Sequence, residues 1–483
     1  MIPLKLIEIA AATGGRVHNA TGDEAVSGPV EFDSREIGPG GLFVAVPGER
    51  VDGHDFAAAA VAKGAAGVLA AREVDAPSVI VPSVADAPTR SVALAGDTDG
   101  SGAAVLAGLA ALARAVVDRL PALTVVGVTG SSGKTSTKDL ISQVLEPLGP
   151  TVAPPGSFNN ELGHPWTVLR ADETTRHLVL ELSARGPGHI RALCEVAPPN
   201  IGVVLNVGSA HLGEFGSREG IAQTKGELAE AATDVVILNA DDPLVRAMAE
   251  RARARVVLVG TSADADIRAH DVQLDEQARA TFQLVTPKGT VPVTLGLHGA
   301  HHVGNALSAA AVGLELGATP EDIAATLSGA QRRSARRMEV TTRDDGVTVV
   351  NDSYNANPES MAAALRTLAR MAGPNGERRT WAVLGVMGEL GDSGAEAHEG
   401  IGRLAARLGI DRLVVVDEQA GAIQHGARLE GTGTGEEPVL VPDVEAAVAL
   451  LDTELRPGDV VLVKASKVAA IWRVADALLG SRA

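Results

Sequence analysis

The feature that most constrains how this chain can fold is a short apolar run that ends in a loop of small residues. The run Val125–Val128 has the composition of a buried strand, and the loop Gly130–Gly133 leads into Lys134, Thr135 and a helix-like segment. Such a loop lets backbone N–H groups converge on phosphate oxygens, and the helix that follows offers the positive end of its dipole. Lys134 adds a mobile cation, and the Thr135 hydroxyl is a ligand suited to Mg²⁺. The pattern predicts a strand–loop–helix unit that binds ATP or GTP.

The loop departs at one position from the common phosphate-loop pattern G-x-x-x-x-G-K-[ST], because Val128 stands where that pattern has its first glycine. Gly130 and Gly133 still give the loop its flexibility. The alternative interpretation, a glycine turn with a solvated lysine, is less consistent with a strand before the loop and a helix after it. We therefore predict that nucleotide phosphates are bound by Gly130, Ser131, Ser132, Gly133, Lys134, Thr135 and Ser136.

Length and composition indicate several α/β domains. The chain has 483 residues, which is too long for one ordinary hydrophobic core, and only 2% of them are aromatic. The abundance of small aliphatic residues suits sheets that are covered by helices. The formal net charge of −18 argues against a nucleic-acid partner and against binding to an anionic membrane surface, so an anionic substrate would need local basic residues.

The sequence carries no clear sign of export or of a membrane span. Cys194 is the only cysteine, which excludes an internal disulfide and is typical of a reducing compartment. The first residues lack the layout of a signal peptide, and the best apolar run, Val105 to Val117, is interrupted by Arg114. We expect a monomeric cytoplasmic protein that works without a membrane.

The order of predicted elements divides the chain into three parts, residues 1–100, 101–332 and 333–483. In the first, strands at 41–46 and 67–70 flank a helix at 56–63, and the Gly- and Asp-rich stretch 95–102 is interpreted as a linker or a surface insertion. The second alternates strands with helices, which implies a mostly parallel sheet with helices on both faces. Its strands are predicted at 123–128, 177–182, 201–205, 235–238 and 255–259, before a β-rich stretch and a long helix at 300–316.

The third part repeats this alternation and predicts a Rossmann-like unit. It lacks a G-x-G-x-x-G fingerprint, so a dinucleotide is not implied. The predicted fold is therefore α/β with three domains, in which a P-loop-type, mostly parallel central sheet is followed by a Rossmann-like C-terminal domain. The third part has predicted strands at 347–350, 380–384, 412–416 and 460–464, and helices at 360–371 and 444–454.

Glu181 is the next residue with a direct chemical interpretation. It lies at the carboxyl end of the predicted strand 177–182, and ligands of open α/β sheets collect at that edge. A carboxylate there can hold Mg²⁺ beside the phosphate loop, whereas the alternative is a solvated glutamate at a strand end. The order of the strands after the phosphate-loop unit favours the metal-binding interpretation.

His211 and Lys225 carry weaker signals. His211 follows the predicted strand 201–205, and Lys225 lies fourteen residues further on. A lone histidine is more often a capping or packing residue, and a lone lysine on a helix is more often solvated. From these residues alone both interpretations stay open.

Three polar loops are further candidates for ligand binding. Phe158–Glu161 follows a Pro-Pro-Gly turn, and Asp33–Arg35 offers a charged fork for a phosphate or carboxylate. A plain turn and a surface ion pair are the respective alternatives. Asn351–Pro358 follows a predicted strand and contains Tyr354, the only tyrosine. A helix cap with Pro358 in the first turn is the alternative there, but the density of polar side chains favours a ligand site.

Together these residues resemble the signature of the Mur ligase family. The set Thr129-Gly130-x-x-Gly133-Lys134-Thr135, Glu181, His211, Lys225 and Asn305 is similar to it in content and order, and the resemblance covers nearly the whole chain. It implies an N-terminal domain for the UDP-muramoyl end of one substrate, a central ATPase domain and a C-terminal domain for the second, amino substrate. It also implies catalytic roles for Lys134, Glu181, His211 and Lys225, Mg²⁺ held by Thr135, Glu181, His211 and Lys225, and a carbamylated Lys225.

The resemblance assigns further ligand contacts. Asn305 would contact the adenine of ATP, and the C-terminal domain would reach ATP through Arg337, Asp352 and Asn355. The contacts implied for the UDP-substrate are Ser34, Arg35, Asn159 and Asn160.

Within the family, segments 158–161, 210–217 and 351–358 are similar to members that act on UDP-muramoyl-tripeptide and D-alanyl-D-alanine. The implied reaction makes an amide in two steps, because ATP first phosphorylates a carboxylate and the amine then displaces phosphate. A related ligase that adds a different amino acid and a nucleotide-binding scaffold without ligase activity are the alternatives. The intact set of acidic and basic residues argues against the scaffold, and ADP release that requires both acceptor and amine would exclude it.

Overall fold

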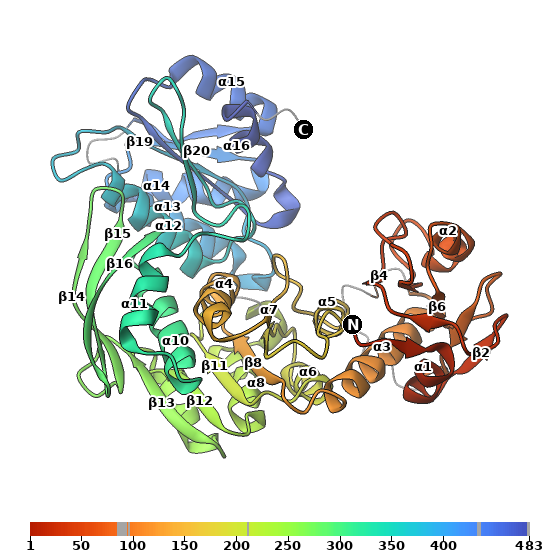
Figure 1. Cartoon of the computed structure of the whole chain (residues 1–483). Helices are drawn as coiled ribbons and strands as arrows, with labels where there is room; N and C mark the ends of the chain where they lie inside the picture. The colour runs from red at the N-terminus through yellow and green to blue at the C-terminus, as the bar shows by residue number, and fades with distance from the viewer. Residues whose placement is uncertain (85–93, 95–96, 210–211, 432–435, 481–483) are drawn as a thin grey trace.

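The computed structural model describes residues 1–84, 94, 97–209, 212–431 and 436–480, and it is built from three α/β domains (Figure 1). The C-terminal domain, blue in Figure 1, lies above the central domain, and the N-terminal domain, red in Figure 1, lies to one side of it. The predicted α/β fold with three domains is confirmed. What matters for function is which edges of the three sheets face one another.

The N-terminal domain contains a five-stranded sheet of order β2-β7-β6-β5-β4, in which only β2 runs antiparallel to its neighbour. The strand predicted at 67–70 is confirmed, and the one predicted at 41–46 is shorter. A separate antiparallel pair joins β1 and β3. The elements are β1 (Leu4–Lys5), α1 (Leu6–Thr13), β2 (Arg16–His18), β3 (Ala25–Val26), β4 (Val30–Glu31), β5 (Leu42–Val44), a 3₁₀ turn (Gly53–Phe56), α2 (Ala57–Ala62), β6 (Gly67–Ala70) and β7 (Ser78–Ile80).

The long helix α3 (Ser101–Asp118) follows this domain. It begins inside the stretch 95–102 that we interpreted as a linker, so the last two residues of that stretch are helical, while 95 and 96 lie outside the described residues. By length and composition alone α3 is apolar enough to cross a membrane, contrary to our expectation that Arg114 interrupts this run, and no other described helix is. However, 56% of it is buried, and it packs against α1, α5 and α6. Arg114 forms an ion pair with Asp118 on its exposed side.

The central domain has a nine-stranded sheet of order β16-β15-β14-β13-β12-β11-β8-β10-β9. The seven strands from β14 to β9 in this order pair in parallel, and β14, β15 and β16 form an antiparallel meander. The predicted mostly parallel sheet is confirmed. One apolar core joins the sheet to α4, α10 and α11, and another joins it to α3, α6 and α8. The strands are β8 (Thr124–Thr129), β9 (Thr151–Val152), β10 (His177–Glu181), β11 (Ile201–Val204), β12 (Val235–Asn239), β13 (Arg255–Gly260), β14 (Ile267–Leu274), β15 (Arg279–Thr286) and β16 (Gly289–His298).

The strand that precedes the phosphate loop, β8, lies in the middle of the parallel part of this sheet, between β10 and β11. Its residues point alternately into the two apolar cores, so both faces of the strand are buried. This explains why its sequence is a continuous hydrophobic run rather than an alternating pattern. The helices of this domain are α4 (Lys134–Leu145), α5 (Gly163–Val168), α6 (His189–Val196), α7 (Leu212–Phe215), α8 (Arg218–Ala231), α9 (Pro243–Arg246), α10 (His302–Glu315) and α11 (Pro320–Gly329).

The C-terminal domain has a six-stranded sheet of order β17-β18-β22-β19-β20-β21, parallel except for β17. The strands predicted at 380–384, 412–416 and 460–464 and the helix predicted at 444–454 have the predicted bounds. The elements are β17 (Glu339–Thr342), β18 (Thr348–Asn351), α12 (Pro358–Met371), β19 (Thr380–Leu384), α13 (Gly394–Arg407), β20 (Arg412–Val416), α14 (Gly421–Glu430), β21 (Val439–Val441), α15 (Val444–Glu454), β22 (Val460–Lys464) and α16 (Trp472–Leu478).

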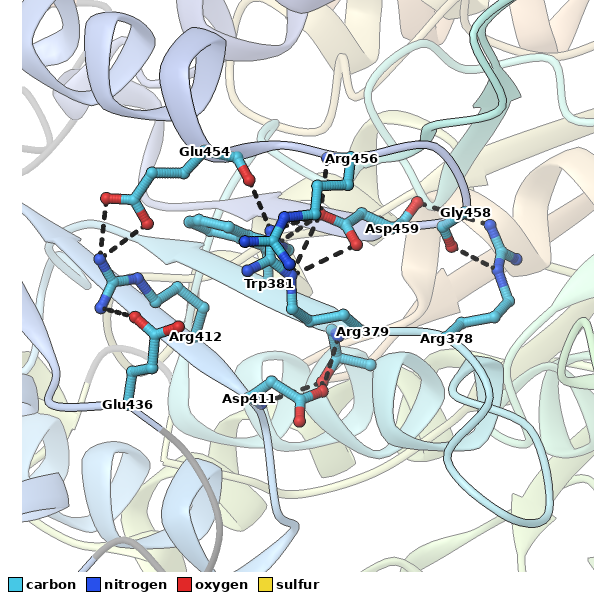
Figure 2. A network of polar contacts seen from close by, with 11 residues as sticks. Arg378, Arg379, Trp381, Asp411, Arg412, Glu436, Glu454, Arg456, Gly458 and Asp459 are labelled. Atoms are coloured by element: carbon cyan, nitrogen blue, oxygen red, sulfur yellow. Dashed lines mark hydrogen bonds and ion pairs between the residues drawn. The ribbon is translucent and has the colours of Figure 1, made fainter.

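A polar network at the amino ends of β19, β20 and β22 holds this sheet together (Figure 2). Trp381 is fully buried, and its indole N–H donates to Asp459 over 3.0 Å. Asp459 also accepts from Arg379 at 2.8 Å, and the Arg379 guanidinium lies 4.7 Å from the Trp381 ring centroid. Arg412, 5.7 Å from the same centroid, pairs with Glu454 and Glu436. One carboxylate therefore satisfies both a buried indole and a guanidinium.

We predict that Asp459→Ala strongly destabilises the C-terminal domain. The substitution leaves the Arg379 guanidinium and the Trp381 N–H without their shared acceptor, and breaking such a buried pair typically costs about 3–5 kcal/mol. Urea unfolding followed by tryptophan fluorescence measures the loss. The control is Glu445→Ala, which removes the exposed partner of Arg473 and should cost under about 1 kcal/mol. Equal small losses in the two variants would show that the network contributes little.

Candidate active site

A cavity of about 540 Å³ lies where the C-terminal domain meets the loop edge of the central sheet. The phosphate loop lines it from below, and loops after β18, β19 and β22 line it from the C-terminal domain. Most of the residues predicted to bind ligands are brought together here, although they come from two domains. Those that line the cavity are Ser131, Ser132, Gly133, Lys134, Thr135, Ser136, Asn159, Asn160, Glu181, Asn305, Arg337, Asp352 and Asn355.

Asn206, which follows β11, organises the first half of the phosphate loop. Its side-chain oxygen accepts from the backbone N–H groups of Ser131 and Ser132 at 3.0 and 2.9 Å, and its amide nitrogen donates to the Ser132 carbonyl at 3.1 Å. A Cβ on Gly130 would lie 2.9 Å from the Leu205 Cβ, so the loop passes too close to β11 for a larger residue. Two of the N–H groups that we expected to face phosphate are therefore held by Asn206.

The second half of the loop keeps the features of a phosphate site. Gly133 has φ +80° and is the N-cap of α4, whose first N–H groups have no acceptor within the helix. Lys134 Nζ donates to the Gly130 carbonyl at 2.7 Å. Burial lowers the pKa of Lys134, an effect that the Glu181 carboxylate opposes. Asn305 of α10 lies against this turn, since its Oδ1 is 2.8 Å from the position of a Cβ on Gly133.

Glu181 lies beside the loop because of strand register. It ends β10 directly opposite Val128 of β8, which places its carboxylate next to the start of α4. The side chain is 1% exposed and accepts from Thr135 Oγ1 at 2.9 Å, from Ser157 at 2.8 Å and from Asn159 Nδ2 at 2.6 Å. A hydroxyl and a carboxylate in contact are the donor types that Mg²⁺ takes beside a nucleotide, so these residues fit the predicted ion.

Arg337 crosses from the C-terminal domain to the same point. Its Nη2 donates to Thr135 Oγ1 at 3.0 Å, and its guanidinium lies 4.1 Å from the ring centroid of Tyr354. The aromatic ring fixes the plane of the guanidinium, as is typical of cation–π contacts. Arg337 therefore reaches the phosphate end of the cavity, as the prediction requires.

Lys225 of α8 is buried but does not line the cavity. Among the described residues it has no hydrogen-bond or ion-pair partner, and burial together with the Lys134 ammonium holds its pKa well below the ordinary value. A lowered pKa favours the neutral, nucleophilic form of an amine. His211, predicted to act with it, lies outside the described residues.

In the C-terminal domain, Asp352 and Asn355 are held by Lys464, a residue that the sequence analysis did not single out. Lys464 Nζ donates to Asp352 Oδ2 at 2.6 Å and to the Asn355 carbonyl at 3.0 Å, and Asp352 Oδ1 accepts from the Met338 N–H at 3.0 Å. Lys464 is 2% exposed, and burial lowers its pKa, opposed by Asp352. The available signal was its position, because a lysine ends a run of otherwise apolar strand residues.

Two further contacts join this domain to the central one. Asn357, the N-cap of α12, donates from Nδ2 to the Ser131 carbonyl at 3.2 Å. Glu359, in the first turn of the same helix, accepts from the Ser209 N–H at 2.7 Å. The start of α12 therefore rests directly on the phosphate loop and on the loop that follows β11.

The four residues predicted for the UDP-substrate do not form one cluster. Asn159 and Asn160 line the cavity, whereas Ser34 and Arg35 do not. Arg35 is largely exposed and pairs with Asp33 at 2.7 Å, and this pair lowers the pKa of Asp33 to about 2. This surface ion pair was our alternative for that loop.

The two segments nevertheless meet through aromatic residues. The ring centroids of Phe32 and Phe158 are 6.3 Å apart, and those of Phe158 and Trp166 are 4.6 Å apart. The Trp166 N–H donates to the Val30 carbonyl at 2.8 Å. These contacts fix the N-terminal domain against the loop that carries Asn159.

Comparisons with known proteins agree with this geometry. Three family models match: "Mur ligase family, catalytic domain" at residues 29–113, "Mur ligase middle domain" at 128–313, and "Mur ligase, glutamate ligase domain" at 336–467. A protein of Mycobacterium tuberculosis named UDP-N-acetylmuramoyl-tripeptide–D-alanyl-D-alanine ligase is 57% identical over 99% of this chain and 98% of its own length.

Solved structures are similar over the same extent. A crystal structure of MurF from Acinetobacter baumannii has a TM-score of 0.84 and 30% identity, and the match covers 99% of each chain. MurF ligase from Thermotoga maritima in complex with ADP has a TM-score of 0.76 and 30% identity, and the match covers 94% of this chain and 98% of that one. The arrangement of all three domains is thus shared.

We predict that Asn206→Ala weakens nucleotide binding by about 10- to 100-fold, because two loop N–H groups lose their acceptor and each unsatisfied group costs about 1–3 kcal/mol. Titration with an ATP analogue measures the effect. Asn200→Ala is the matched control, since Asn200 accepts from the Val125 N–H at the opposite end of β11. It should leave nucleotide affinity within about threefold, while equal losses in both variants would contradict a specific role for Asn206.

Proposed function

The chain belongs to the Mur ligase family, and we propose that it catalyses the reaction for which its full-length relatives are named. It is an ATP-dependent ligase that joins D-alanyl-D-alanine to UDP-N-acetylmuramoyl-tripeptide, giving the pentapeptide precursor of peptidoglycan, ADP and phosphate. The observation that carries the proposal is the shared cavity, in which the phosphate loop and Glu181 of the central domain face the Asp352–Lys464 pair of the C-terminal domain. One site can therefore activate one substrate and receive another.

The reaction proceeds in two steps. A carboxylate is a poor electrophile, so its oxygen first attacks the γ-phosphorus of ATP, and ADP leaves. The amine of the dipeptide then attacks the acyl carbon, the C–O bond to phosphate breaks, and an amide forms. In the first step Lys134 and the N-terminus of α4 offset the negative charge of the transferred phosphoryl group. Arg337 brings a further cation from the C-terminal domain. Closure of the two domains around the substrates would limit water near the acyl phosphate.

We assign Mg²⁺ to Thr135 and Glu181, with a second ion at His211 and at a carbamate on Lys225. The described residues contain no cluster of three His, Cys, Asp or Glu side chains that could hold a metal alone, and phosphate oxygens and waters would complete the coordination. When bound, the ions neutralise charge on the phosphates and the acyl oxygen. The burial of Lys225 and its lowered pKa support the carbamate, since CO₂ reacts with a neutral amine and a lower pKa favours that form.

The remaining assignments follow the same premise. Asn305 contacts the adenine, Asp352 and Asn355 contact ATP, and Ser34 and Arg35, with Asn159 and Asn160, contact the UDP-substrate. We propose that the enzyme works as a monomer in the cytoplasm. The need for ATP and the single, buried cysteine support that location.

The test is a panel of amines with UDP-N-acetylmuramoyl-tripeptide and ATP, with the product identified by its mass. D-Alanyl-D-alanine should give the pentapeptide, and ADP release should require both substrates. Lys134→Ala should be about 100- to 1,000-fold slower, as expected when one contact to the transferred charge is lost. Lys288→Ala, at an exposed turn, is the control. A preference for a single amino acid would identify a different ligase of the family, and absence of any turnover would favour a scaffold.

We further predict that Lys225→Ala is about 100- to 1,000-fold slower, because an anion on the metal is lost. Acetate should restore part of the rate, whereas methylammonium, which replaces an unmodified lysine side chain, should not. Lys225→Arg should stay inactive, since a guanidinium remains cationic. An NMR signal from ¹³C-bicarbonate that is present in the normal enzyme and missing in Lys225→Ala would report the carbamate directly. Rescue by methylammonium but not by acetate would contradict it.

A further inference from the structure

One ion pair crosses the cavity and has no part in the mechanism above. Arg185 Nη2 of the central domain lies 2.9 Å from Glu389 Oε1 of the C-terminal domain, although the residues are 204 positions apart. Both side chains line the cavity, and they are 33% and 37% exposed, so they lie at its rim. We call them the rim pair. The rim pair therefore joins the two domains at the edge of the cavity.

Arg185 is held close to the phosphate loop by its place in the chain. It follows Glu181 by four residues, on the loop between β10 and α6. Its backbone N–H donates to His189 Nδ1 at 3.3 Å, and the neighbouring Ser183 hydroxyl bonds to the Asn159 carbonyl at 3.0 Å. The backbone of this loop is therefore fixed at both sides of Arg185, while its side chain extends to the other domain.

Glu389 is held in an uncommon backbone conformation. It has φ +64°, a value that non-glycine residues other than Asn and Asp rarely adopt. The loop before it is fixed by the buried His398, whose Nε2 accepts from the Met387 N–H at 2.8 Å and whose Nδ1 donates to the Gly394 carbonyl at 2.6 Å. The next residue, Leu390, is buried in the core of the domain. Strain of this kind is often retained where the direction of one side chain matters.

Glu389 lines the same cavity as Lys134, which is assigned to the transferred phosphoryl group. Its carboxylate also acts against the burial that lowers the pKa of Lys134. Lys464 is a buried cation of the C-terminal domain that also lines the cavity, and it is already bonded to Asp352 and Asn355. Arg185 forms an ion pair with Glu389 over 2.9 Å.

We propose that the rim pair is the receptor for the second, zwitterionic substrate, with Glu389 receiving the ammonium group of the dipeptide and Arg185 receiving its carboxylate. The proposal rests on the proposed function and names the residues that bind its amine substrate. A zwitterion that inserts between the two side chains replaces one ion pair by two, so neither charge is left without a partner. The signs of the two side chains set the polarity, because the Glu389 carboxylate can receive only the ammonium group and the Arg185 guanidinium only the carboxylate.

The test separates binding of the dipeptide from activation of the acceptor. Hydroxylamine is a small nucleophile that is mostly uncharged at neutral pH, and it traps an acyl phosphate as a hydroxamate without needing either charge of the rim pair. Glu389→Gln should lower kcat/KM for D-alanyl-D-alanine by about 10- to 150-fold, as expected for one charged hydrogen bond, and should leave hydroxamate formation within about twofold. Glu389→Asp, which keeps the charge and tolerates a positive φ, should retain more activity than Glu389→Gln.

A second measurement tests whether Arg185 binds the carboxylate of the dipeptide. The normal enzyme should prefer D-alanyl-D-alanine over D-alanyl-D-alaninamide by about 10- to 150-fold, and Arg185→Gln should lose that preference. Arg370→Ala is the control. Arg370 donates to the Leu274 carbonyl at 2.6 Å, so this substitution removes a contact between the two domains that lies outside the cavity. It should change neither the preference nor hydroxamate formation.

Four outcomes would overturn the proposal. If both variants slow hydroxamate formation and ligation equally, the rim pair is only a latch between the domains. The double variant Arg185→Glu with Glu389→Arg keeps an ion pair between the domains but exchanges the positions of its two charges. If this variant ligates as the normal enzyme does, the pair is again only a latch, because the ammonium group would have lost its carboxylate at position 389. Unchanged kinetics in both variants would exclude any role. If the normal enzyme forms no hydroxamate with ATP and the UDP-tripeptide, the proposed function itself fails, and the receptor fails with it.

Discussion

Parallel pairing of β10, β8 and β11 is the constraint on which the rest of the site depends. The register sets Glu181 opposite Val128 and Val204 opposite Thr129, so the three strands end at one edge of the sheet. The residues that follow them are the phosphate loop, its carboxylate partner and Asn206, which lies 75 positions from Ser131 in the chain. A slip of one residue in either pairing would turn these side chains to the opposite face. The apolar residues of these strands, which are buried on both faces of the sheet, hold the register.

The C-terminal domain uses the same rule and is placed so that its own strand ends face those of the central sheet. Asp352 follows β18, Lys464 ends β22, and Glu389 follows β19, which are three adjacent strands. The two edges are joined by a few polar contacts, among them Arg337 with Thr135 and Asn357 with Ser131. The apolar cores of the two domains are separate, apart from Ala278, so their relative position depends on hydrogen bonds that ligands can replace. An interface of this kind suits a domain that must open for two substrates and close for the reaction.

Much of the fold was predictable because it is encoded locally. The strands at 67–70, 380–384, 412–416 and 460–464 are apolar runs with clear ends, and the observed bounds match the predicted ones. The start of α3 was missed because Gly- and Asp-rich residues precede it, whereas its apolar face is explained by α1, α5 and α6, which are remote in sequence. Short elements such as β9, with two residues, carry no periodicity of their own.

The candidate site divides in the same way. Lys134, Thr135 and Glu181 were found because a local pattern or a strand end marks them. Asn206 and the rim pair were missed because each acquires its meaning only from a partner on a distant segment, such as the phosphate loop for Asn206. The predicted grouping of Ser34 with Asn159 shows a different limit of sequence analysis, because here two segments were expected to meet through their polar residues. The segments do meet, but through Phe32 and Phe158 rather than through the polar residues, because burial of aromatic rings dominates at that junction.

The distribution of charge ties the site to its ligands. The chain as a whole is acidic, with a formal charge of −18, yet buried lysines gather at and beside the cavity. Lys464 is compensated by Asp352, and Lys134 by a carbonyl and the nearby Glu181 carboxylate. For Lys225 the described residues offer no such partner, and burial holds its pKa well below the ordinary value. A triphosphate balances the cations at the phosphate loop, and conversion of Lys225 to a carbamate would turn the uncompensated position into an anion. The cavity is thus arranged for ligands that bring negative charge, in a protein whose net charge is itself negative.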